Sequence, residues 1–105
     1  MRSAEQLDCK SLQPGCLIDV ETTSRHYKIE CLGGSKIRIS GHPQFCPTPV
    51  VALLQGSVTN EGTLAKGMIE TGSRLAFLIG ERLPVTTSKV LNVQVDPPAA
   101  PYGVQ

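Results

Sequence analysis

The chain contains no tryptophan, and its only aromatic residues are two tyrosines and two phenylalanines. Proteins that bind single-stranded nucleic acids stack the bases on aromatic side chains, so this scarcity argues against such an activity. Ten lysine and arginine residues nearly balance nine acidic ones, and they form no basic cluster. Because a nucleic-acid binder needs a clustered positive face, we expect no nucleic-acid partner.

No apolar run of the chain approaches the roughly 20 residues that span a bilayer, so we expect no membrane association. The first residues, MRSAEQLDCKSLQPG, lack the apolar centre of a signal peptide, and the initial Met indicates that no leader was removed. We therefore expect a cytoplasmic protein whose four cysteines are free thiols.

What the chain does contain is a repeated alternation of apolar and polar residues with a period of two, which predicts β-strands. The alternating stretches are 16–23, 26–32, 35–40, 74–80 and 85–95. The nearly continuous apolar run 50–58 predicts a strand covered on both faces or, alternatively, a short buried helix. Because a closed sheet removes the exposed edges of short strands, we predict an all-β fold, a small six- to seven-stranded antiparallel, meander-rich barrel.

The expected domain covers residues 14–96. Residues 1–13 are polar and weakly patterned, which predicts a flexible arm or a short helical turn. Residues 97–105 form a proline-rich tail that cannot supply all the hydrogen bonds of a strand.

The parity of the apolar positions also predicts how neighbouring strands pair, because side chains that face each other must lie on the same side of the sheet. Short turns at 24–25, 33–35 and 71–73 satisfy this rule, and glycine suits the three-residue turns. The predicted pairs are Val20 with Ile29, Ile18 with Cys31, Cys31 with Ile37, Ile29 with Ile39, and Ile69 with Leu75. In the last strand, the same parity places Leu91, Val93 and Val95 on one face.

The stretch SGHPQFCPTP holds His42 and Cys46 at a spacing that suits one half of a zinc site, and Cys9 is a third candidate ligand. A closed zinc site needs four ligands. Cys16 and Cys31 fall on the inward face, where a thiol behaves as a small apolar group. A zinc-stabilised module therefore remains one alternative, and a rigid surface loop without metal is the other.

No catalytic constellation is recognisable in the sequence. It lacks a G-x-S-x-G motif, and neither histidine has a neighbouring acid that indicates a triad. Asp19 and Glu21 share an outward face, which is typical of a solvated strand. We expect no enzymatic activity, no catalytic residues and no cofactor.

Two segments of the chain echo each other. Thr22–Arg25 and Thr86–Lys89 both read Thr-Thr-Ser followed by a cation. Hydroxyl groups beside a cation can hold a phosphate, although threonine is also a good strand residue and serine a good turn residue.

The span from Pro14 to Val95 resembles an uncharacterised family of small bacterial all-β proteins. The resemblance is carried by a proline segment at 47–49, Gly56-Ser57, Gly72 and Thr87-Ser88. This resemblance implies the fold of the chain but does not imply an activity.

The stretch 53–79 is also similar in outline to the second half of the PilZ domain, a six-stranded barrel that binds cyclic di-GMP. Ser57 and Gly72 match that motif, whereas Gln55 replaces its Asp or Asn, and Gly62 comes later than its first glycine. No two arginines have the Arg-x-x-x-Arg spacing that grips the nucleotide. The resemblance therefore implies, at most, a cyclic dinucleotide receptor with a degenerate site.

The residues of that degenerate site would be Arg25, Arg38, Ser57 and Lys89. The leading prediction is different: a non-enzymatic interaction or regulatory module that acts through its surface. Its partner would be a second copy of the chain or another protein, with Leu32 and Leu78 as outward apolar residues or a free strand edge as the contact.

Overall fold

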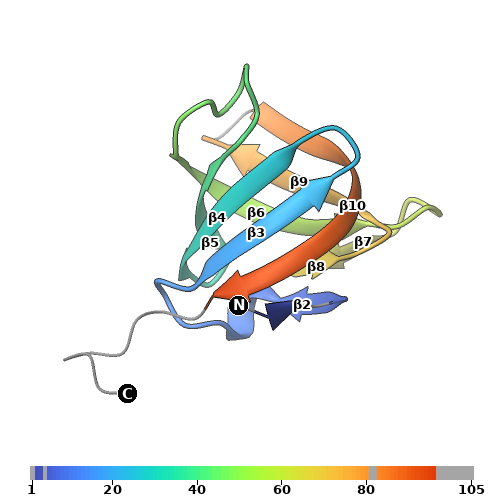
Figure 1. The fold of residues 1–105 in the computed structure, drawn as a ribbon, viewed down its shortest axis with the longest axis horizontal. Coiled ribbons are helices and arrows are strands. Elements are labelled where there is room, and N and C mark those ends of the chain that lie inside the picture. The colour runs from blue at the N-terminus through green and yellow to red at the C-terminus, as the bar shows by residue number, and fades with distance from the viewer. Residues whose placement is uncertain (1, 4, 81–82, 97–105) are drawn as a thin grey trace.

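The computed structural model describes residues 2–3, 5–80 and 83–96, so the proline-rich tail at 97–105 lies outside the described residues. This part of the chain is all-β and contains no α-helix (Figure 1). Its elements are β1 (Arg2–Ser3), β2 (Gln6–Asp8), the 3₁₀ turn η1 (Cys9–Ser11), β3 (Leu17–Thr22), β4 (His26–Gly33), β5 (Lys36–Ser40), β6 (Val50–Val58), β7 (Leu64–Lys66), β8 (Met68–Glu70), β9 (Arg74–Ile79) and β10 (Leu83–Asp96).

Six of these strands form a closed antiparallel ring. In order around the ring they are β3, β4, β5, β6, β9 and β10, and β10 pairs again with β3. Strand β10 closes the ring because its first half pairs with β9 and its second half with β3, and Figure 1 shows it bending around the molecule. The predicted all-β fold with a small antiparallel barrel is confirmed.

The remaining strands are short additions to this ring. Strand β1 extends the sheet beside β10, β7 pairs with β6, and β2 with β8 forms a separate two-stranded sheet. The segment 1–13, expected as a flexible arm or a short helical turn, therefore contains β1, β2 and the 3₁₀ turn η1. It is tied to the β7–β8 insertion, where the Cys9 N–H donates to the Gly67 carbonyl at 3.0 Å.

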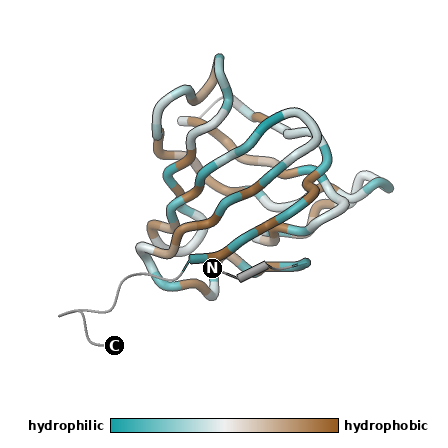
Figure 2. Tube along the Cα trace, viewed as in Figure 1, coloured by the Kyte–Doolittle hydropathy of each residue, from teal (hydrophilic) through white to brown (hydrophobic). Residues whose placement is uncertain are grey.

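Apolar and polar residues alternate along the strands, so one face of each strand of the ring points into the barrel. Figure 2 shows the corresponding changes of hydropathy along the chain. The largest side chains that are fully buried are Tyr27, Phe77, Ile18, Ile29, Ile37, Ile39, Ile69 and Leu75. The rings of Tyr27 and Phe77 meet edge to face, with centroids 6.1 Å apart. Each such side chain stabilises the fold by about 1.5–3 kcal/mol relative to an exposed one.

The predicted pairing of β4 with β5 is confirmed. Cys31 lies opposite Ile37 and Ile29 lies opposite Ile39, with an irregularity between Cys31 and Gly33. Gly33 and Gly34 both have positive φ, at 115° and 58°, which is the conformation that the glycines were expected to supply.

The predicted pairing of β3 with β4 is wrong by two residues. Val20 lies opposite Tyr27, and Ile18 lies opposite Ile29. The two-residue turn lies at 23–24, one residue earlier than expected, because Thr22 and Arg25 close it: the Thr22 N–H donates to the Arg25 carbonyl at 2.8 Å, and the Arg25 N–H donates to Thr22 Oγ1 at 2.9 Å. A shift of two residues leaves every side chain on its original face, so the buried set is unchanged.

The predicted pairing of Ile69 with Leu75 is also wrong. Ile69 belongs to β8 and lies opposite Leu7, whereas Leu75 lies opposite Ser57 of β6. The turn between them forms, with the Gly72 N–H donating to the Val90 carbonyl at 2.8 Å, but it redirects the chain from one sheet to the other.

Two predictions of burial are wrong for separate reasons. Leu91 is 54% exposed while Val93 is buried, because the register of β10 against β3 shifts between Val90 and Asn92. The run 50–58 is a strand, which was one of the two predicted alternatives. It is not covered on both faces, because its outward residues Val51 and Leu53 are each 47% exposed.

Candidate functional site

The two echoing segments lie side by side. The Thr23 N–H donates to the Lys89 carbonyl at 3.0 Å, and the Ser24 N–H donates to Ser88 Oγ at 3.2 Å. Lys89 also lies opposite Arg74 in the pairing of β10 with β9. The structure therefore brings the backbones of the predicted site residues Arg25 and Lys89 to one end of the barrel.

The other two predicted ligand-binding residues lie elsewhere. Arg38 is on the outer face of β5, where its Nη1 lies 2.6 Å from Glu30 Oε1. Ser57 is fully buried; its hydroxyl donates to the Met68 carbonyl and accepts from the Glu70 N–H, both at 2.9 Å. Because these bonds attach the β8 backbone to β6, Ser57 has a structural role, and the four predicted residues do not converge.

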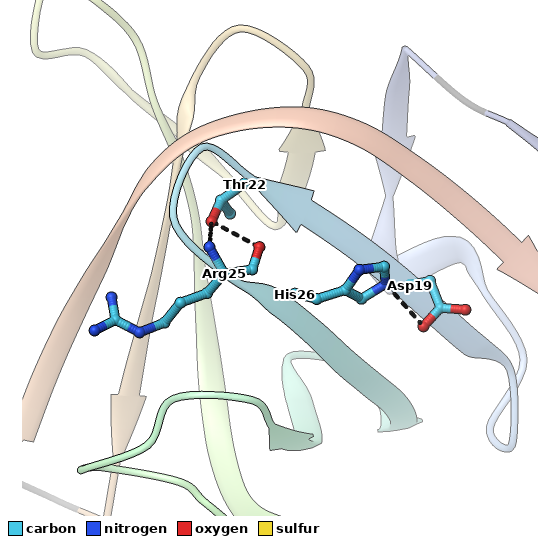
Figure 3. Close-up of polar contacts among 4 residues, drawn as sticks. All are labelled: Asp19, Thr22, Arg25 and His26. Atoms are coloured by element: carbon cyan, nitrogen blue, oxygen red, sulfur yellow. Dashed lines mark hydrogen bonds and ion pairs between the residues drawn. The ribbon is translucent and has the colours of Figure 1, made fainter.

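The polar contacts beside the β3–β4 turn are drawn in Figure 3. His26 Nε2 lies 3.7 Å from Asp19 Oδ1, and both side chains are partly exposed. The side chain of Arg25 extends away from this pair. A histidine and an acid without a third, nucleophilic partner do not form a catalytic triad.

His42 and Cys46 form a small bridged loop. The Cys46 N–H donates to the His42 carbonyl at 3.0 Å, and His42 Nδ1 accepts the N–H groups of Gln44 and Phe45 at 3.1 and 3.2 Å. Desolvation, together with the positive charge of Arg25, lowers the pKa of His42. Two backbone donors on Nδ1 also favour the neutral imidazole.

The candidate zinc ligands belong to different surroundings. Cys9 Sγ contacts Cys31 Sγ at 3.4 Å, while Cys46 is buried in the loop of His42. Within residues 2–3, 5–80 and 83–96, no three His, Cys, Asp or Glu side chains form a group that could hold a metal ion.

A hollow of about 260 Å³ lies against β3, β4 and β5. It is on the outside of the barrel, because its polar lining residues alternate with buried ones along each strand. The residues that line it are Leu17, Ile18, Asp19, Lys28, Ile29, Glu30, Arg38, Ser40, Pro49 and Asp96. This volume is slightly below the roughly 300–1,000 Å³ of sites that enclose small molecules.

Cross-strand pairing arranges the outer side chains in rows. One row runs through Asp96, Leu17, Glu30, Arg38 and Val51. The next row runs through Gln94, Asp19, Lys28 and Ser40. Leu17, which is 50% exposed, and Val51 therefore flank the Glu30–Arg38 ion pair.

On the β6 side of this ion pair, apolar side chains gather in what we name the outer patch: Val51, Leu53, Leu78 and Pro84. Lys36, Leu53, Leu78 and Pro84 are successive partners across β5, β6, β9 and β10. Residues directly opposite each other share a face, as do Val51 and Leu53 at positions i and i+2, so the patch is continuous. Lys36 and Arg38 border it.

The sequence indicated only part of this patch. Leu78 was expected to face outward and is half-buried, as is the other candidate, Leu32. Val51 and Leu53 were missed, because an unbroken apolar run carries no period from which an exposed face can be identified.

Because the ring is closed, few strand edges are left free to pair with another protein. Among the described strands, those with a free edge are short: β1, β2, β7 and β8 have two or three residues each. A free strand edge, one of the two contact types expected from the sequence, is therefore limited to these elements. Side chains on the outer face offer the larger surface.

Comparison with models of protein families, with curated proteins and with solved structures finds no match for this chain. In the part of the chain that the structure describes, no helix has the length and apolar character needed to cross a bilayer.

Proposed function

We propose that this chain is a non-enzymatic protein-interaction module of the cytoplasm, and that its partner binds to the outer patch. The observation that carries the proposal is the exposure of Val51 and Leu53, each 47%, on one face of a central strand of the ring. Contiguous apolar side chains with a charged border are typical of contacts between proteins.

A protein fits this surface better than a small molecule does. The neighbouring hollow is about 260 Å³, and its lining includes charges of both signs, such as Lys28 and Asp96. An exposed apolar area next to a small hollow with charged residues in its lining suits an apolar side chain of a partner protein surrounded by polar groups. The partner is either a second copy of the chain or a different protein.

The test places a benzophenone amino acid at Leu53 and irradiates cells that contain the protein. The control is the same substitution at Leu91, which is exposed to a similar extent, 54%, but lies at the β10 irregularity. We expect one covalent adduct from position 53 and none from position 91. The mass of the adduct distinguishes a second copy from another protein, and equal labelling from both positions would contradict the proposal.

A second candidate function is recognition of a phosphate-bearing ligand such as cyclic di-GMP, using Arg25 and Lys89. It is favoured by the placement of Lys89 opposite Arg74, since like charges on paired strands repel and an anion between them would relieve the repulsion. Neither Arg25 nor Lys89 has an ion-pair partner among the described residues.

This candidate is tested by thermal and chemical unfolding with added cyclic di-GMP. A ligand at 100 times its dissociation constant adds about 2.7 kcal/mol to the free energy of unfolding. We expect the increase to disappear in Lys89→Ala and to persist in Lys36→Ala, whose cation lies on β5 opposite Leu53, at the border of the outer patch. No increase in the unaltered protein removes this candidate and leaves the first one standing.

A further inference from the structure

Two buried thiols that are distant in the sequence meet in the structure. Cys9 Sγ lies 3.4 Å from Cys31 Sγ, and the two residues are 1% and 2% exposed. Cys9 begins η1, in the N-terminal segment, whereas Cys31 points inward from β4 of the ring. Both are free cysteines.

The backbones that carry these thiols are held by separate hydrogen bonds. The Cys9 N–H donates to the Gly67 carbonyl at 3.0 Å, and the N-cap residue Asp8 accepts the Lys10 N–H at 3.1 Å. The Cys31 N–H donates to the Cys16 carbonyl at 2.9 Å. The sulfur contact is therefore set by the fold. Because a sulfur–sulfur bond is about 2.05 Å long, the two sulfurs must approach by roughly a further 1.4 Å to form it.

We propose that Cys9 and Cys31 form an oxidation site at which a low-molecular-weight disulfide, such as oxidised glutathione, produces a reversible Cys9–Cys31 bond. This bond joins the N-terminal segment, through η1, to the ring.

The exchange proceeds in two balanced steps. The Cys9 thiolate attacks one sulfur of the small disulfide and displaces one thiolate, which takes up a proton. Cys31 then loses its proton and attacks the Cys9 sulfur, displacing the second small thiol. The protein loses two hydrogens as two thiols become one disulfide, and the small disulfide is reduced to two thiols.

The contact between the thiols shifts the pKa of both residues. A hydrogen bond from Cys31 lowers the pKa of Cys9, against the effect of burial. The same hydrogen bond, together with burial, raises the pKa of Cys31. Cys9 reacts first because it lies on the N-terminal segment, and Cys31 of the ring completes the bond when the two sulfurs meet again.

The reagent reaches Cys9 when the N-terminal segment opens. Strand β2 has three residues and pairs with β8 in a separate two-stranded sheet, so this segment can detach while the six-stranded ring stays closed. Oxidation then holds the segment in place, which makes this local opening rarer.

The other two cysteines serve as internal controls. Cys16 is buried near Cys31, where desolvation and the neighbouring thiol raise its pKa, and Cys46 is buried in the loop of His42. The variant Cys16→Ser/Cys46→Ser keeps only the proposed pair.

The test equilibrates the unaltered chain and this double variant in buffers with increasing ratios of oxidised to reduced glutathione. After quenching by alkylation, we expect two fewer alkylated cysteines than in the reduced protein and a proteolytic fragment that links Cys9 to Cys31. Formation of the bond should raise the melting temperature by on the order of 10 °C, and dithiothreitol should reverse the rise.

Three results would overturn the proposal: four alkylated cysteines in the unaltered chain at the highest ratio, a link from Cys31 to Cys16 instead, or a bond between two copies. Cys9→Ser should form no intramolecular bond and show no rise. If the double variant does not fold, the proteolytic fragments of the unaltered chain alone show which cysteines are linked.

Discussion

Gly56 passes so close to Ala65 that a Cβ atom on the glycine would lie 2.1 Å from the Ala65 carbonyl oxygen. This contact lies where β6 pairs with β7 along one edge and with β9 along the other, and the register against β9 shifts between Leu54 and Gly56. The φ angle of Gly56 is 141°, a value that residues with a side chain rarely adopt.

Gly56→Ala should therefore be strongly destabilising, by at least about 2–3 kcal/mol, because the overlap is with backbone that cannot rotate away. The matched control is Gly62→Ala, whose φ is also positive, at 86°, but whose Cβ would meet nothing within 4 Å. It should lose about 1 kcal/mol. Urea unfolding measures both, and equal losses would show that the close approach is unimportant.

Much of the barrel was predictable because parity is a local property of the sequence. Alternation identified the inward residues of β3, β4 and β5, and the number of residues in a turn had to preserve it. The exact register was not predictable, since pairings two residues apart bury the same side chains. The hydrogen bonds of Thr22 with Arg25 decided between them.

The candidate sites were less predictable, because both depend on contacts between distant segments. The outer patch needs β9 and β10 beside β6 to place Leu78 and Pro84 next to Leu53. The contact of Cys9 with Cys31 needs η1 to fold against β4, and nothing local in residues 1–13 indicates that. The echo of threonine and serine did indicate a real adjacency, through the hydrogen bond of Ser24 with Ser88.

Ser57→Ala should destabilise the protein by about 1–3 kcal/mol, because it leaves a buried donor and acceptor of β8 without partners. The matched control is Ser88→Ala, which removes an exposed hydroxyl that accepts one backbone N–H at 3.2 Å. That variant should lose at most about 1 kcal/mol. The comparison is made by chemical unfolding, and a larger loss in Ser88→Ala than in Ser57→Ala would contradict the structural role of Ser57.

Charged substitutions in the outer patch should leave the fold intact. Leu53→Glu and Leu91→Glu replace side chains that are 47% and 54% exposed. Each should change the free energy of unfolding by no more than about 0.5 kcal/mol, as is usual for surface positions. Loss of partner binding by Leu53→Glu alone can then be attributed to the contact surface, whereas a loss of several kcal/mol would show that Leu53 is a core residue.

The lowered pKa of His42 predicts a dependence of stability on pH. As pH falls from about 7.5 through the ordinary histidine pKa of about 6.5, the unfolded chain binds a proton at this residue more readily than the folded chain. The free energy of unfolding should therefore fall with pH until the lower, folded-state pKa is passed. Replacing the imidazole by an amide, in His42→Asn, should remove this part of the slope.

The measurement uses His26→Gln as the background, because it leaves His42 as the only histidine of the chain. Urea unfolding at a series of pH values gives the slope with and without His42, and the carboxylates contribute equally to both proteins. In the same background, the imidazole proton resonances of His42 should titrate with a midpoint below about 6.5. A midpoint above that value, or a shallower slope with His42 present, would mean that the loop stabilises the imidazolium, against the acceptor role of Nδ1 toward Gln44 and Phe45.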